Sequence, residues 1–96
     1  MVHEDDEVFA INDIHPRAPV HVMIIPKTHI PSAREIGDEH GGLLARMVSV
    51  AKSLAVENGV HDDGYRLTFN VGEQGGQTIF HLHLHLLGGR QMGFEG

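Results

Sequence analysis

The sequence predicts an α+β domain in which one long helix packs on an antiparallel sheet. Several short segments alternate apolar and polar residues as strands do, and one longer segment repeats apolar residues at helical spacing. The strands lie before and after this helix instead of alternating with several helices, which favours an antiparallel sheet. With 96 residues, the chain is expected to form a single domain over residues 1–96.

Composition and charge exclude several classes of function. A formal net charge of −6 argues against a nucleic-acid polymer or an anionic membrane as the main partner, although a small phosphate ligand remains compatible. The absence of cysteine excludes disulfides and thiolate metal sites. The sequence has no apolar run long enough to span a membrane and no signal-peptide pattern, so we expect a cytoplasmic location.

The chain before the long helix predicts two strands. Residues 4–6 are expected to form a turn, and residues 7–12 a strand with alternating faces. Residues 20–25 are almost wholly apolar and mostly β-branched, which predicts a central strand buried on both faces and stopped by Pro26. Two prolines stiffen the loop between the strands, residues 13–19.

Two helices are expected next. Ser32 and Glu35 have the spacing of a capping box, which predicts a short helix that ends at Gly37. Asp38 is a candidate cap for a long helix that ends at Gly59. The apolar residues of the long helix are expected to pack on the sheet, and part of this broad stripe is available to a second copy: Leu43, Leu44, Met47, Val48, Val50, Ala51, Leu54 and Ala55.

Three histidines alternate with apolar residues in the last predicted strand, residues 79–87, which follows a half-buried strand over residues 65–71. On a strand, His81, His83 and His85 would share one face at a spacing of about 6.6 Å. The opposite face would be buried through Phe80, Leu82, Leu84 and Leu86. A slip of one residue would bury three imidazoles, so this alternation should fix the register.

Three interpretations of these histidines are open. They could form a solvated strand face, although histidine is not a favoured strand residue. Two or three of them could bind zinc, but no acidic residue between Glu73 and Glu95 is available as a neighbouring ligand. The favoured hypothesis is catalytic: a neutral imidazole attacks phosphorus while the neighbouring histidines donate and accept protons.

The glycine-rich loop over residues 72–78 favours the catalytic interpretation, because it leads directly into the histidines. Its glycines leave backbone N–H groups open to a phosphate. Asn70 before the loop and Thr78 at its end can donate hydrogen bonds to phosphate oxygens. The sequence lacks the Gly-Lys-Ser/Thr of a P-loop.

Two residues of the first half could belong to the same site. Asp13 either caps its loop or accepts hydrogen bonds from a ribose diol. His21, on the central strand, is either a satisfied buried histidine or a residue that supports the other histidines. The role of His29 is open, and four others are expected at the surface: His3, His15, His40 and His61.

The segment His-Leu-His-Leu-His-Leu-Leu, residues 81–87, resembles the defining motif of the histidine triad (HIT) family. Residues 13–21 and 25–30 are similar to the entry loop and central strand of that family, and residues 70–78 to its phosphate loop. Gly-Gly-Arg-Gln-Met, residues 88–92, resembles the C-terminus of the Hint branch, the histidine triad nucleotide-binding proteins. The resemblance extends from about Glu4 to Met92.

The resemblance implies an α+β homodimer with one continuous sheet. It also implies hydrolysis of purine nucleoside phosphoramidates without a metal or other cofactor, so the expected partner is a purine nucleoside monophosphate or phosphoramidate. Family members usually carry a further N-terminal segment that closes part of the base pocket, and the domain is expected to lack it. Phe94 lies in a tail that is expected to influence the choice of leaving group.

The resemblance also implies roles for individual residues. His83 would attack the α-phosphorus and become a nucleotidyl-histidine, with His85 near the leaving group and with His81 and His21 orienting His83. Asp13 would bind the ribose, and the purine pocket would be lined by Ile11, Ile14 and Met23. Phosphate contacts would come from Asn70, Gly76, Thr78 and His85. The alternatives are a nucleotide-binding or scaffold protein with weak catalysis, a dinucleoside polyphosphate hydrolase and a zinc-dependent hydrolase.

Overall fold

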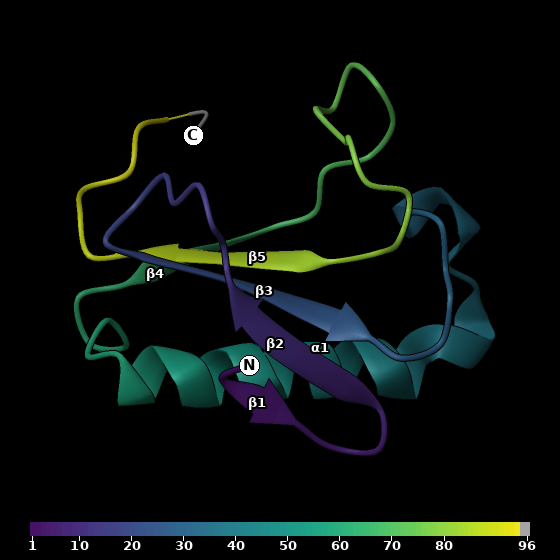
Figure 1. The fold of residues 1–96 in the computed structure, drawn as a ribbon, viewed down its shortest axis with the longest axis horizontal. Coiled ribbons are helices and arrows are strands. Elements are labelled where there is room, and N and C mark those ends of the chain that lie inside the picture. The colour runs from purple at the N-terminus through teal and green to yellow at the C-terminus, as the bar shows by residue number, and fades with distance from the viewer. Residues whose placement is uncertain (95–96) are drawn as a thin grey trace.

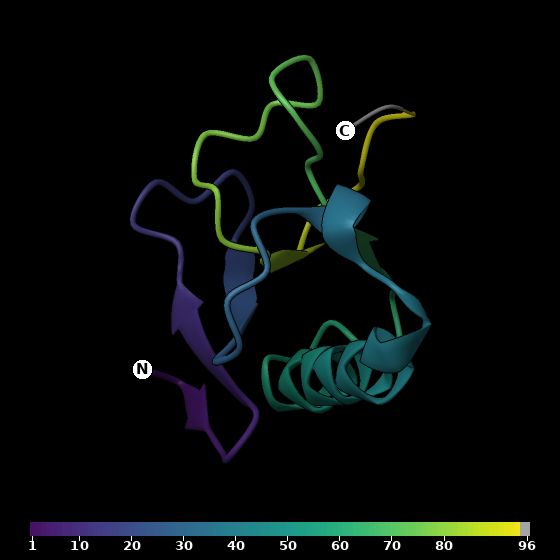
Figure 2. The ribbon, with the colours of Figure 1, turned by 90° about the vertical axis from the view of Figure 1, so that its right-hand side faces the viewer.

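A computed structural model describes residues 1–94 and shows a five-stranded antiparallel sheet with one long helix on one face (Figures 1 and 2). The sheet order is β1-β2-β3-β5-β4. The strands are β1 (His3–Glu4), β2 (Val8–Asn12), β3 (Val20–Pro26), β4 (Tyr65–Thr68) and β5 (Leu84–Gly88). The helices are α1 (Gly41–Glu57) and two single 3-10 turns, η1 (Ala33–Glu35) and η2 (Asp38–His40). The predicted fold class is confirmed.

The core lies between α1 and the central strands. The helix buries Met47, Val50, Ala51, Leu54 and Ala55, all of them among the predicted apolar positions. They pack with side chains of β3 and β5 that are almost inaccessible to solvent: Val22, Ile24, Leu84 and Leu86. Burial of this apolar surface is the main source of stability for the fold. In the described part of the chain, no helix has the length and apolarity needed to cross a membrane.

The register of β3 against β5 brings two histidines together on the face of the sheet opposite α1. Met23 pairs with His85, and His21 pairs with Leu87. Because side chains alternate along a strand, His21, Met23 and His85 all lie on this open face. Met23 and Ile25 are only half-buried, so β3 is not buried on both faces as predicted. Helix α1 covers only one side of the sheet, which leaves this face available for a ligand.

The last strand is shorter than the predicted 79–87. It begins at Leu84, so only His85 of the three alternating histidines lies on a strand. Residues 79–83 leave the ladder because the backbone N–H of Leu82 bonds to the carbonyl of Ile30 instead of to β3. Leu82 is buried as expected, but Ile79 and Phe80 are each 59% exposed. The prediction that Phe80 packs beneath the histidines was wrong.

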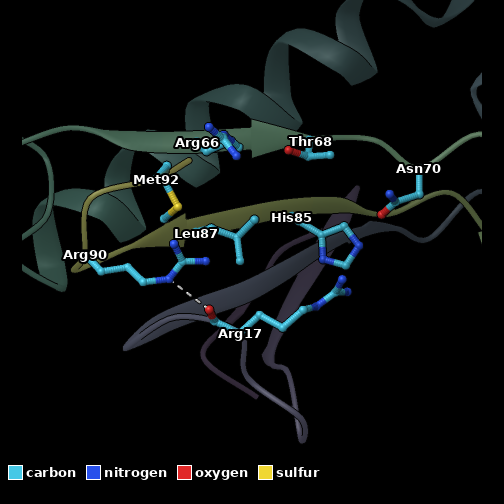
Figure 3. A pocket seen from close by; sticks show the side chains of 8 residues that line it. All are labelled: Arg17, Arg66, Thr68, Asn70, His85, Leu87, Arg90 and Met92. Carbon is cyan, nitrogen blue, oxygen red and sulfur yellow. Dashed lines mark hydrogen bonds between the residues drawn. The ribbon is translucent and has the colours of Figure 1, made fainter. Parts of the chain in front are cut away.

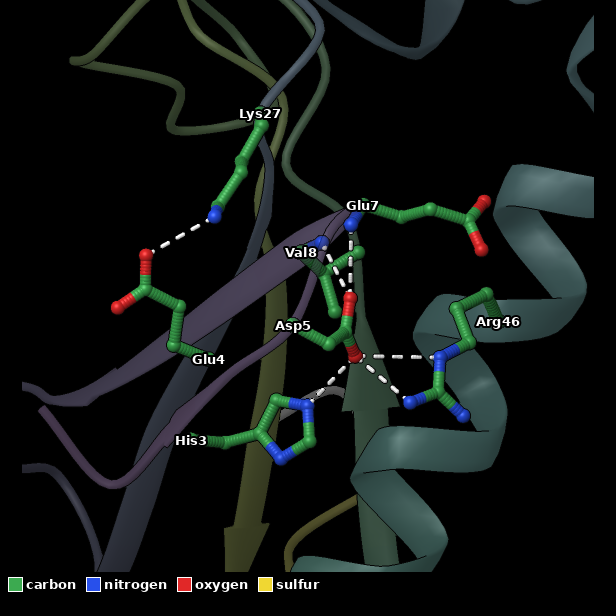
Figure 4. A network of polar contacts seen from close by, with 7 residues as sticks. All are labelled: His3, Glu4, Asp5, Glu7, Val8, Lys27 and Arg46. Atoms are coloured by element: carbon green, nitrogen blue, oxygen red, sulfur yellow. Dashed lines mark hydrogen bonds and ion pairs between the residues drawn. The ribbon is translucent and has the colours of Figure 1, made fainter.

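The N-terminal turn contains a short strand that the alternation did not predict. Glu4 belongs to β1, and the turn to β2 is held by Asp5 (Figure 4). The Asp5 carboxylate accepts hydrogen bonds from His3, from two backbone N–H groups and from Arg46 of α1. These bonds hold the pKa of Asp5 well below its usual range, with the His3 bond contributing most. Strand β1 has only two residues, which is too short to show an alternation of apolar and polar side chains in the sequence.

Three further bounds differ from the prediction. The predicted 65–71 strand ends at Thr68, and the predicted short helix is a single turn that ends before Gly37. Ser32 caps that turn and donates to the Glu35 carboxylate. Asp38 lies inside a second turn and caps nothing; α1 begins at Gly41. Of the apolar stripe on α1, Val48 is 46% exposed and lies outside the core.

Candidate active site

A cavity of about 570 Å³ lies on the open face of the sheet. Nine of its lining residues are the nine predicted nucleotide contacts: Ile11, Asp13, Ile14, Met23, Asn70, Gly76, Thr78, His83 and His85. Its other lining residues are Asn12, His15, Arg17 and Ile79, which sequence reasoning did not select. The β2–β3 loop, the glycine-rich loop and the histidine segment therefore converge on one space. A concave site with a few convergent polar groups is typical of small-molecule binding.

His83 is held in one tautomer by a hydrogen bond to a nearby backbone carbonyl. Its Nδ1 lies 2.8 Å from the carbonyl oxygen of His81. A carbonyl only accepts hydrogen bonds, so Nδ1 carries the ring proton and Nε2 keeps a lone pair. Among residues 1–94 no hydrogen-bond partner engages this Nε2. The arrangement provides an oriented imidazole with its nucleophilic nitrogen free.

His85 is oriented by a chain of hydrogen bonds that starts in the β2–β3 loop. The backbone N–H of Arg17 donates to Nδ1 of His21 over 3.1 Å, which places the His21 proton on Nε2. His21 Nε2 lies 2.9 Å from His85 Nδ1 and donates to it. His85 then carries its proton on Nε2. The chain thus fixes His85 as a hydrogen-bond donor through the nitrogen not bonded to His21.

Burial keeps these two histidines neutral. It lowers the pKa of His85 from 6.5 to about 4, and the neighbouring His83 and His21 add to this shift. Burial also lowers the pKa of His21, although the Asp13 carboxylate, 3.4 Å away, opposes the change. For Asp13 itself, burial raises the pKa, but the hydrogen bond from the His15 backbone N–H and the positive charges that His21, His85 and Arg17 carry at the acidic pH where Asp13 titrates outweigh it and lower the value.

The depressed pKa of His85 predicts that stability falls on acidification. As the pH falls below 6.5, His85 becomes protonated in the unfolded chain, but in the folded protein it stays neutral until about pH 4. The unfolded state therefore binds more protons in this range, and the free energy of unfolding decreases as the pH falls through it. His85→Asn should therefore reduce the loss of unfolding free energy between pH 7 and pH 5, as measured by urea denaturation. The exposed His61→Asn is the control and should leave the loss unchanged. An equal loss of unfolding free energy in the unmodified protein, His85→Asn and His61→Asn would contradict the prediction.

His81 and His21 do not orient His83 through side-chain contacts. The His81 ring does not line the cavity; its Nε2 donates to the Pro26 carbonyl over 2.8 Å, and its Nδ1 lies 3.1 Å from Nδ1 of His29. These bonds tie the histidine segment to the end of β3, and only the carbonyl of His81 reaches His83. His21 bonds to His85 instead. His29, whose role the sequence left open, supports His81.

Gln77 holds the glycine-rich loop in place and was not singled out from the sequence. Its buried side-chain carbonyl accepts from the Gly72 backbone N–H, and its amide donates to the Pro31 and Ile79 carbonyls. Two glycines of the loop have positive φ, +69° at Gly72 and +83° at Gly76, a conformation that other residues rarely adopt. The Asn70 amide donates to the Gly75 carbonyl, so Asn70 also supports the loop. A single glutamine in a loop gives no sequence signal for such a role.

Gln77→Leu should destabilise the fold markedly. The substitution leaves a buried N–H and two carbonyls without partners, which typically costs about 1–3 kcal/mol for each group that stays unpaired. We expect the free energy of unfolding in urea to fall by about 2–4 kcal/mol. The exposed Gln74→Leu, in the same loop, is the matched control. A loss in Gln77→Leu no greater than in the control would contradict this role.

One group of side chains in the described range has the spacing of metal ligands. Ligand atoms of Asp13, His21 and His85 all lie within 4.8 Å of one another. This set differs from the one considered in the sequence, because it contains one alternating histidine and a carboxylate far from it in the chain. Two of these side chains already bond to each other, through His21 Nε2 and His85 Nδ1.

Comparisons with known proteins agree with this geometry. Residues 1–96 match the family described as scavenger mRNA decapping enzyme C-term binding. The chain is 46% identical to the purine nucleoside phosphoramidase of Escherichia coli strain K12 over 93 residues, which cover 97% of this chain and 78% of that protein.

Solved structures show the same fold. A HIT family hydrolase from Legionella pneumophila superposes with a TM-score of 0.95 at 49% identity, covering 97% of this chain and 83% of that one. A HIT family hydrolase from Clostridium thermocellum gives a TM-score of 0.92 at 49% identity, covering 96% and 80%. With its triad, its phosphate-loop pattern and its sheet, this chain belongs to the histidine triad family and is a hydrolase.

Proposed function

We propose that this protein hydrolyses purine nucleoside 5′-phosphoramidates through a covalent nucleotidyl intermediate on His83. The observation that carries the proposal is the fixed tautomer of His83 beside the nucleotide-sized cavity. A neutral imidazole with a free lone pair is a nucleophile, and the reaction requires one at the α-phosphorus. The similarity to a purine nucleoside phosphoramidase supports the choice of substrate.

The substrate is proposed to lie across the cavity with its base near β2 and β3. Ile11, Ile14 and Met23 offer apolar contacts to the purine, and the Asp13 carboxylate can accept hydrogen bonds from the ribose hydroxyls. The α-phosphate would lie against the glycine-rich loop, where backbone N–H groups and the Thr78 hydroxyl can donate to its oxygens. In this position the phosphorus is within reach of His83.

The proposed chemistry has two steps. First, the amine nitrogen takes a proton from solvent, His83 Nε2 forms a bond to the α-phosphorus, the P–N bond breaks, and the amine leaves. Second, water attacks the phosphorus, the His83–P bond breaks, and the nucleoside monophosphate is released. Two successive displacements divide one difficult reaction into two easier ones. His85 Nε2–H donates a hydrogen bond to the charge that develops on the phosphoryl or leaving group.

Turnover of adenosine 5′-phosphate linked to the ε-amine of lysine tests this proposal. We expect protein that elemental analysis shows to be metal-free to release AMP and lysine at the same rate with and without EDTA. Chromatography of the products measures this rate. Loss of activity with EDTA would support a zinc-dependent hydrolase at Asp13, His21 and His85 instead. AMP binding without turnover would indicate a nucleotide-binding or scaffold protein. Cleavage of dinucleoside polyphosphates faster than of the lysine compound would indicate a dinucleoside polyphosphate hydrolase.

We also propose that the protein works as a homodimer in the cytoplasm, with strand β4 of each copy extending one sheet. β4 is the terminal strand of the sheet order, so its outer edge has unpaired backbone groups. Val48 and Val56 of α1 are exposed and could contribute apolar contact. Sedimentation at micromolar concentration should give twice the chain mass, and a monomer would contradict this proposal.

A further inference from the structure

The proposed nucleophile stands on a short segment that lies outside the sheet. Residues 79–83 do not pair with β3, because the ladder between β3 and β5 begins at Leu84. Within this segment, Nδ1 of His83 donates to the carbonyl of His81 over 2.8 Å. The tautomer of a histidine follows the hydrogen bond that its ring makes. The position of the His81 carbonyl therefore decides how firmly the lone pair of His83 is kept on Nε2.

The connection between β3 and η1 supports this segment. Pro26 at the end of β3 and Ile30 are both buried, so the backbone between them is held at both ends. The Pro26 carbonyl accepts a hydrogen bond from the His81 ring over 2.8 Å. The Ile30 carbonyl accepts one from the Leu82 backbone N–H over 2.6 Å. The histidine segment is therefore fastened to this connection and not to a neighbouring strand.

His29 completes the support from within the same connection. A carbonyl only accepts, so Nε2 of His81 carries the ring proton and its Nδ1 keeps a lone pair. This Nδ1 lies 3.1 Å from Nδ1 of His29, so His29 is the donor. The two rings meet edge to face, with their centroids 5.0 Å apart. Both nitrogens of His81 are thus engaged, which fixes the residue that carries the carbonyl.

The rings of His29 and His81 lie outside the space proposed for the substrate. Two cavities adjoin His85, the large one described above and a smaller one of about 150 Å³ that Figure 3 shows. Among residues 1–94, neither His29 nor His81 lines either cavity. His85 is held separately from the β2–β3 loop, and Figure 3 shows Arg17 of that loop extending toward it. An effect of His29 on catalysis must therefore pass through His81 to His83.

We propose that His29 is a positioning residue for the nucleophile: its hydrogen bond to His81 holds the carbonyl that keeps His83 in the reactive tautomer. This inference rests on the proposed function. No bond to His29 forms or breaks in the reaction, so its loss should slow the chemical step and leave nucleotide binding unchanged. One hydrogen bond changes a rate or an equilibrium by about three- to tenfold, a far smaller effect than removal of His83 itself.

Two substitutions of the exposed His29 differ mainly in the donor. His29→Asn keeps an amide N–H near the place of Nδ1, whereas His29→Leu has a similar size and no donor. We expect kcat for the AMP–lysine compound to fall about three- to tenfold in His29→Leu and to stay within about twofold in His29→Asn. Calorimetry should give the same AMP dissociation constant for both. His61→Leu changes an exposed histidine between α1 and β4 and should alter neither quantity.

The tautomer of His83 is a second readout that needs no substrate. Nitrogen NMR of labelled histidine distinguishes a ring nitrogen that carries a proton from one with a lone pair. The Nδ1–H form of His83 should lose population in His29→Leu and be retained in His29→Asn. An unchanged tautomer in His29→Leu, or an equal kcat in both variants, would overturn the inference. If the unmodified protein cleaved no phosphoramidate, the proposed function would fail, and the NMR comparison would still decide whether His29 positions His83.

Discussion

His83→Ala is expected to lower the turnover of a nucleoside phosphoramidate by about 10⁴-fold or more, as loss of a covalent nucleophile commonly does. The variant loses the only nitrogen that we propose to bond to phosphorus. His85 is engaged through Nδ1 by His21, and His81 does not line the cavity. AMP release from the lysine compound, measured over hours at high protein concentration, gives the rate.

The same variant should still bind AMP. The proposed base, ribose and loop contacts do not include the His83 ring, so calorimetry should give an AMP dissociation constant within about tenfold of the unmodified protein. His61→Ala, which changes an exposed histidine far from the cavity, should leave both turnover and binding unchanged. Substantial turnover by His83→Ala would show that another group attacks phosphorus.

Gly75→Ala is expected to have the second-largest effect on activity, a loss of about 10²–10³-fold. A Cβ on Gly75 would lie 2.2 Å from the backbone carbonyl oxygen of Val71, so the loop would have to move. The Asn70 amide and the backbone N–H groups of the loop would move with it, away from the proposed phosphate position. Steady-state kinetics should show most of the loss in kcat, because the loop donors act on charge that develops in the transition state.

Gly42→Ala supplies the matched control. A Cβ at Gly42, in the first turn of α1, meets nothing within 4 Å. Alanine is the better helix former, so this variant should gain about 0.5–1 kcal/mol in unfolding free energy and keep full activity. If Gly75→Ala retained the activity of Gly42→Ala, the loop would have no role in positioning the phosphate.

The elements with strong periodicity could be predicted from the sequence. The apolar stripe identified α1, because burial against the sheet imposes it. The apolar run of residues 20–25 identified β3, although only one face of this strand is fully buried. The alternation of histidine and leucine was a poorer guide to the last strand. Its leucines are buried as expected, but residues 79–83 are placed by contacts with Ile30 and Pro26, which local alternation does not record.

The candidate site was predictable in its membership but not in its internal connections. The nine expected nucleotide contacts line one cavity, since motif and resemblance both select them. The bond between His21 and His85 depends on the β3–β5 register, and the role of Gln77 depends on three backbone groups brought together by folding. Arg17 orients His21 through its backbone N–H, and because every residue except proline has this group, the residue type gives no sign of the contact.

Trapping of the covalent intermediate is the most direct test of the account. The protein would be mixed with excess AMP–glycine phosphoramidate, quenched within milliseconds under conditions that preserve phosphoramidate bonds, digested and sequenced by mass spectrometry. We expect an adenylyl group on His83, formed and lost at rates consistent with turnover. An adenylyl group on a different residue, or steady turnover with no labelled protein at any time, would contradict attack by His83.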